Sequence, residues 1–70
     1  MTGREFVAAF AAALGTHDLT DEQAKTLLQL ASVAAHGSER IAAPLVCYVA
    51  GHAGIDVAEA LAAAEQLLAE

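Results

Sequence analysis

The sequence predicts an all-α protein of four helices. Apolar residues recur every three or four positions, and no segment alternates polar and apolar residues as a strand does. Three helix-starting capping boxes lie along the chain, namely Thr2 with Glu5, Thr20 with Gln23, and Asp56 with Glu59. We therefore expect one compact domain over residues 1–70, with helices at about 3–14, 21–36, 43–52 and 57–69.

The first two helices are bounded by capping residues and glycines. Phe6, Phe10 and Leu14 recur every four residues in the first helix, and Gly15 follows it. The second helix begins after Thr20, and Gly37 after it suits the left-handed conformation that ends helices.

The third helix begins near Pro44, whose missing N–H costs nothing in a first turn, and is apolar on nearly all sides. A helix of this kind is buried on more than one face, so we expect it to be the central helix. The alternative is that one face, carrying Tyr48 and Val46, docks on a partner or on a second copy. The fourth helix has an apolar stripe that includes Val57, Leu61 and Leu68, opposite Glu59, Glu65 and Gln66.

The predicted core is thin. Hydrophobic residues make up 57% of the chain, but many are alanines, which bring little apolar area. A core of this size supplies about 3–5 kcal/mol, and small domains supplement it with disulfides, a metal or oligomerisation. A single cysteine excludes an internal disulfide. The remaining ways to supplement the core are oligomerisation, a partner surface, or close packing of alanine-faced helices.

Charge and hydropathy narrow the classes of partner. Nine acidic and three basic residues give a net charge of −6, without the basic patch that nucleic acid requires. The longest uncharged run, 41–55, contains proline and glycines and is shorter than the ~20 apolar residues of a membrane-spanning helix. Cys47, alone in an apolar run, fits a reducing cytoplasm, where we expect the protein to reside.

A polar cluster of His36, Glu39 and Arg40 lies between the second and third helices. As a structural joint, His36 and Arg40 would interact with helix ends, and Glu39 would pair with Arg40. As a functional site, Arg40 and His36 would bind an anion near the first turn of the third helix. Capping is the favoured interpretation.

No catalytic or metal site is expected. His17, His36, His52 and Cys47 lack the spacing of structural zinc sites. Ser32 lies four residues before His36, but a nucleophile and base need a third, orienting group. We predict no enzyme activity and no cofactor.

Three segments, 27–31, 35–45 and 51–54, resemble a small helical domain of unknown function from bacteria, mostly actinobacteria. The most specific part is Ala-His-Gly-x-Glu-Arg-x-Ala-Ala-Pro-Leu at 35–45, and the similarity extends from the first helix to about Gly54. The chain departs from that family at Gln29, where an acid is common, and at Ile41, where a proline is common. It also lacks a first-helix tryptophan, for which Phe6 is the nearest substitute.

The resemblance implies an association with molybdenum-cofactor guanylyltransferase-like proteins, to which such domains are fused, and it transfers no catalytic residue. We therefore expect a non-catalytic accessory or interaction module that binds a protein partner or forms a homo-oligomer, and binds neither nucleic acid nor membrane. The candidate contact residues are His36, Glu39, Arg40 and Tyr48. The alternative is a small-molecule or anion-binding protein that uses the junction between the second and third helices.

Overall fold

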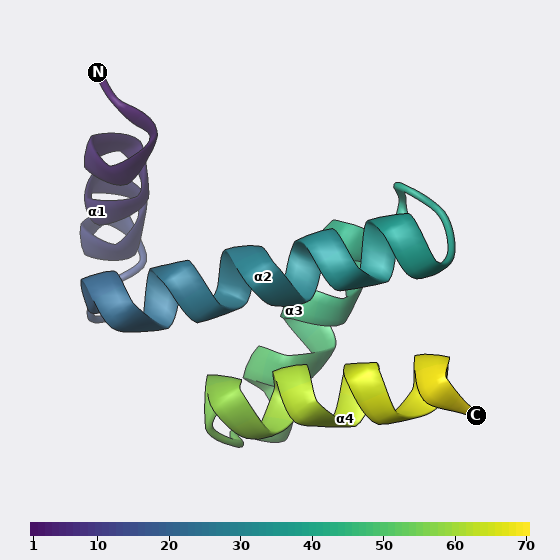
Figure 1. Ribbon diagram of the computed structural model, residues 1–70. Coiled ribbons are helices and arrows are strands. Elements are labelled where there is room, and N and C mark those ends of the chain that lie inside the picture. Colours follow the sequence, from purple (N-terminus) through teal and green to yellow (C-terminus); the bar gives the residue numbers. More distant parts are fainter.

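The computed structural model describes all residues 1–70 and contains four helices and no strand. They are α1 (Gly3–Ala13), α2 (Asp21–Gly37), α3 (Ala42–Ala53) and α4 (Val57–Ala69) (Figure 1). The predicted all-α, four-helix fold is confirmed, and every observed helix end lies within one residue of its predicted position. No helix is both long and apolar enough to cross a bilayer.

The central helix is α2, and the prediction that the third helix would be central is wrong. α2 packs against both α3 and α4, and it carries two of the few buried residues, Leu30 and Ala34. Figure 1 shows α3 passing behind α2 and α4 lying below it. α3 contains no buried residue, because it covers one side of α2 and nothing covers its own outer side. This apolar helix therefore lies at the surface of the molecule and not at its centre.

α1 stands to one side of the unit formed by α2, α3 and α4, near the first turns of α2 (Figure 1). Only Ala11 of this helix is buried. The radius of gyration is 12.6 Å, whereas a compact domain of this length has about 11 Å. The projection of α1 accounts for the elongated shape.

Capping residues explain where the first two helices begin. Thr2 Oγ1 accepts from Glu5 N at 3.1 Å, and Glu5 Oε1 accepts from Thr2 N at 2.7 Å. Thr20 and Gln23 form the same reciprocal pair at 3.0 Å. Asp56 is the N-cap of α4, but its side chain makes no capping hydrogen bond, so the third predicted capping box is absent.

Two glycines end helices in the left-handed conformation, Gly15 with φ 70° as predicted and Gly54 with φ 71°. Gly37 does not, because it is the last helical residue of α2. Its position is explained by packing: a Cβ atom there would overlap the Leu68 side chain of α4. Here glycine permits a close helix approach instead of a turn.

Candidate functional site

The polar cluster at the α2–α3 junction does not converge on one point. His36 Nδ1 lies 3.1 Å from Ser32 Oγ, one turn back on α2. Glu39 and Arg40 do not form the predicted ion pair, and only their backbone carbonyls are engaged, accepting from Ala42 N and Ala43 N. All three side chains are exposed. An anion site at this junction stays a prediction.

The residue that caps the end of α2 is Ser38, which the sequence analysis did not single out. Its backbone N–H and its hydroxyl both donate to Ala34 O, at 3.0 and 2.6 Å. The capping role expected of His36 and Arg40 is therefore performed by Ser38. A serine directly after the last helical glycine was the available signal.

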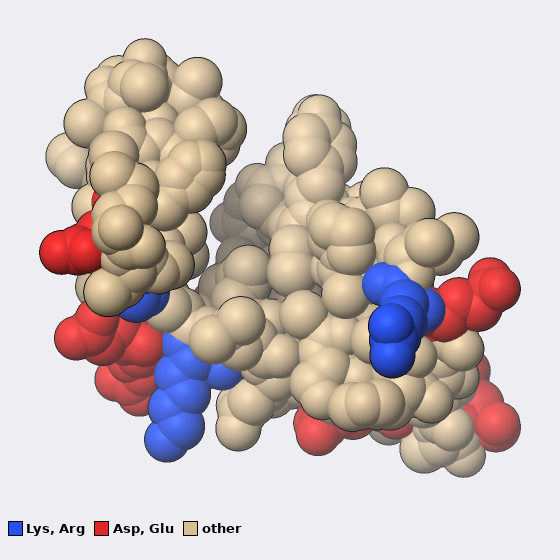
Figure 2. All heavy atoms as spheres, turned by 90° about the horizontal axis from the view of Figure 1, so that it is seen from above, with Lys and Arg blue, Asp and Glu red and all other residues tan.

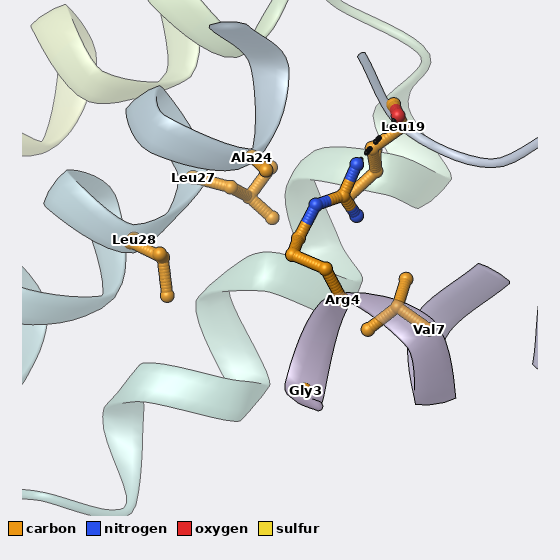
Figure 3. Close-up of a pocket in the computed structure, with 7 residues that line it drawn as sticks. All are labelled: Gly3, Arg4, Val7, Leu19, Ala24, Leu27 and Leu28. Atoms are coloured by element: carbon orange, nitrogen blue, oxygen red, sulfur yellow. Dashed lines mark hydrogen bonds between the residues drawn. The ribbon is translucent and has the colours of Figure 1, made fainter. Parts of the chain in front are cut away.

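None of His36, Glu39 and Arg40 lines a cavity. The largest pocket, about 360 Å³, lies instead between α1 and the first half of α2. Its lining is mainly apolar and consists of Gly3, Arg4, Val7, Leu19, Ala24, Leu27 and Leu28 (Figure 3).

Arg4 joins α1 to the start of α2 at the edge of this pocket. Its Nη2 donates to Leu19 O at 2.9 Å, and its Nη1 lies 3.3 Å from Asp18 Oδ1. A longer contact of 3.4 Å reaches Asp21. The guanidinium is thus occupied within the chain, and the part of Arg4 that faces the leucines in Figure 3 is its aliphatic stem.

The apolar stripe of α1 is covered on one side by the rest of the chain, and its other side is exposed. Ala11 is buried, whereas Phe6, Phe10 and Leu14 are more than half exposed. The two phenyl rings lie 6.3 Å apart on neighbouring turns and form one continuous apolar edge. We call Phe6, Phe10 and Leu14 the α1 edge.

α3 presents a second apolar surface. Leu45, Tyr48 and Val49 are 60%, 73% and 64% exposed, and we call these three residues the α3 face. The Tyr48 ring stacks on His52 at 6.0 Å with an angle of 9°. Tyr48 is thus accessible as a partner contact requires, while Val46, the other residue of that hypothesis, is half-buried and lines a pocket with Leu30 and Val49.

The remaining reactive side chains are dispersed. No three His, Cys, Asp or Glu side chains lie close enough together to hold a metal ion. Burial raises the pKa of the Cys47 thiol above its ordinary value, which favours the protonated form. A nucleophilic cysteine needs the opposite shift.

A family model described as a domain of unknown function, DUF6457, matches residues 1–70. The chain belongs to the DUF6457 family. No curated protein and no solved structure gives a significant match. The expectation of a domain of unknown function is confirmed, and the DUF6457 match covers the polar junction as well as both apolar surfaces.

Proposed function

We propose that this DUF6457 domain is a non-catalytic interaction module that binds another protein through the α3 face. The observation that carries the proposal is the distribution of large apolar residues. Thirteen are exposed, whereas Leu30 is the one large residue among the four that are buried. Three of them, Leu45, Tyr48 and Val49, form the α3 face, and exposed apolar patches mark interaction sites in soluble proteins.

The α3 face has the chemistry of a recognition surface. It combines an aromatic residue with a hydroxyl, two aliphatic residues and no charge, and α3 has no acidic or basic residue other than His52. Protein interfaces are enriched in tyrosine and depleted of charge at their centres. Tyr48 is therefore the central contact of the proposed interface.

The absence of activated groups supports a non-catalytic role. Burial raises the pKa of the Cys47 thiol, which disfavours the thiolate, and the side-chain hydrogen bond of His36 goes to Ser32, with no third group to orient the pair. The exposed apolar surface favours a binding role over a catalytic one.

The proposed partner is a cytoplasmic nucleotidyltransferase of the molybdenum-cofactor guanylylation type. The support is the resemblance carried by the 35–45 motif, which implies an association with such proteins. The domain then acts as an accessory subunit, with the chemistry confined to the enzyme.

Titration calorimetry with the purified domain and this nucleotidyltransferase tests the proposal. We expect binding with a negative heat-capacity change, because apolar surface is buried. Tyr48→Asp should weaken binding at least about tenfold, since it places a carboxylate in an apolar contact. Ala62→Asp, an equal charge change at an exposed position of α4, is the matched control and should bind normally.

Three results would contradict the proposed function. The first is unchanged binding by Tyr48→Asp, and the second is no binding by the unaltered domain. The third is turnover of a nucleotide or pterin substrate by the isolated domain that is lost in His36→Ala.

A further inference from the structure

We propose that the hollow between α1 and α2 is filled by α1 of a second copy, in a symmetric homodimer. Figure 2 shows this hollow as an open notch between α1 and the rest of the molecule, with uncharged side chains on its visible walls. In a two-fold dimer each copy would place its α1 edge in the hollow of the other. This goes beyond the proposed function, which concerns the α3 face.

The surface area of the chain points to a missing partner. A compact monomer of 7.1 kDa exposes about 4,100 Å² by the usual scaling with mass. This chain exposes 5,289 Å². The difference, about 1,200 Å² per chain, exceeds the roughly 800 Å² that each partner buries in a standard protein–protein interface.

The exposed apolar residues around the hollow supply a suitable interface. Val7 on α1 and Leu28, 71% exposed on α2, line the hollow, and the α1 edge, which does not line it, is the exposed surface that would enter the hollow of a second copy. The pocket between α1 and α2, about 360 Å³, is large enough to accept aromatic side chains and is lined by Val7 and Leu27. Two phenylalanines on successive turns of α1 are matched by a leucine-lined pocket on the same molecule, as a symmetric dimer requires.

The same chain does not fill its own hollow. Near its start, α1 is tied to the beginning of α2 by the Arg4 contacts with Leu19 O and Asp18. At its end it is tied by the connection to Thr20, in which Thr16 N donates to Ala11 O. Held at both ends, α1 cannot close over the hollow without breaking these contacts.

The effect of salt on association distinguishes a second copy of this acidic chain from a basic partner. Each chain carries −6, so two copies repel each other except where uncharged surfaces meet. Added salt screens this repulsion and should strengthen a homodimer. Salt would weaken binding of a basic partner to the same acidic domain.

Sedimentation equilibrium of the full chain over a range of concentrations tests the inference. We expect a mass twice that of the 7.1 kDa chain, with dimerisation that strengthens as salt is raised. Phe10→Asp should weaken dimerisation at least about tenfold, because the added carboxylate would be buried. Leu28→Asp, on α2, should do the same, and it keeps the test informative if the first variant fails to fold by circular dichroism.

Ile41→Asp is the matched control, because Ile41 is 67% exposed and lies at the other end of α2 from α1. It should dimerise normally. A monomer mass at every concentration would overturn the inference, as would full dimerisation by both folded variants. A monomer that still binds the nucleotidyltransferase overturns the dimer alone, and a dimer that binds no nucleotidyltransferase overturns the proposed function alone.

Discussion

At the scale of single residues, Cys47 shows how position on α3 decides chemistry. It lies on the partly covered side of the helix, one residue before the exposed Tyr48. Burial raises the pKa of its thiol, because the thiolate is poorly solvated there. The folded chain therefore favours the protonated thiol more than the unfolded chain does.

We predict that iodoacetamide alkylates Cys47 more slowly in the folded protein than in urea at the same alkaline pH, because thiolate is the reacting form. For the same reason, the stability of the fold should fall as the pH rises from the thiol pKa of the unfolded chain through the higher pKa of the folded chain. Mass spectrometry follows the alkylation rate. The control is Cys47→Ala combined with Gln66→Cys at an exposed position of α4. Faster alkylation of Cys47 in the folded chain would contradict this prediction.

At the scale of helices, the N-caps of α2 and α4 are not equivalent. Thr20 makes both bonds of a capping box, while Asp56 occupies the same position before α4 without a side-chain bond. We expect Thr20→Ala to lower the free energy of unfolding by about 1 kcal/mol. Asp56→Ala should lower the free energy of unfolding by clearly less, since only the charge of Asp56 near the N-terminus of α4 is lost.

Urea unfolding of the two variants measures this difference, with Thr26→Ala, inside α2, as a control for loss of a threonine away from a cap. Equal losses for Thr20→Ala and Asp56→Ala would contradict a stabilising role for the hydrogen bond that Thr20 Oγ1 accepts from Gln23 N.

The helix ends could be predicted from sequence because caps and glycines act within a few residues. The packing of the helices could not be predicted, because it depends on contacts between residues that are far apart in the sequence. Gly37 was predicted to end α2 in a left-handed turn, but the Leu68 side chain, thirty-one positions later, explains why it is glycine. The same limit applies to α3, whose apolar sequence is compatible with a central or an exposed helix.

The convergence of the candidate site residues could not be predicted for the same reason. Tyr48 is exposed, as the expected partner contact requires, and its role as a contact residue stays a prediction. The pocket between α1 and α2 was missed. Arg4 bonds to Leu19 O at the edge of this pocket, and a contact to a backbone carbonyl leaves no sequence pattern.

At the scale of the whole molecule, the direction of α1 depends on Arg4. Its contacts with Leu19 O and Asp18 cross the gap between α1 and α2, and its side chain is 40% exposed. We predict that Arg4→Ala speeds amide exchange in α1 and leaves α2, α3 and α4 unchanged. Because the Arg4 side chain is partly exposed, we expect Arg4→Ala to lower the free energy of unfolding by only about 1 kcal/mol.

Hydrogen exchange with mass spectrometry checks this prediction, best in the Phe10→Asp background, where a second copy should not protect α1. Arg4→Lys keeps the charge but not the fork of donors, so its effect should be intermediate. Uniform exchange changes across all four helices would show that Arg4 supports the entire fold instead.

The smallest dimension of the molecule is 18 Å, little more than one helix stacked on another. In so thin a body, the interior is made mostly of alanines, with Ala11, Ala34 and Ala60 buried. The residues that hold the fold and the residues that face other molecules are therefore almost separate sets. Substitutions that alter what the domain recognises need not disturb its interior, and over evolution one scaffold of this kind can acquire different partners while its helices stay in place.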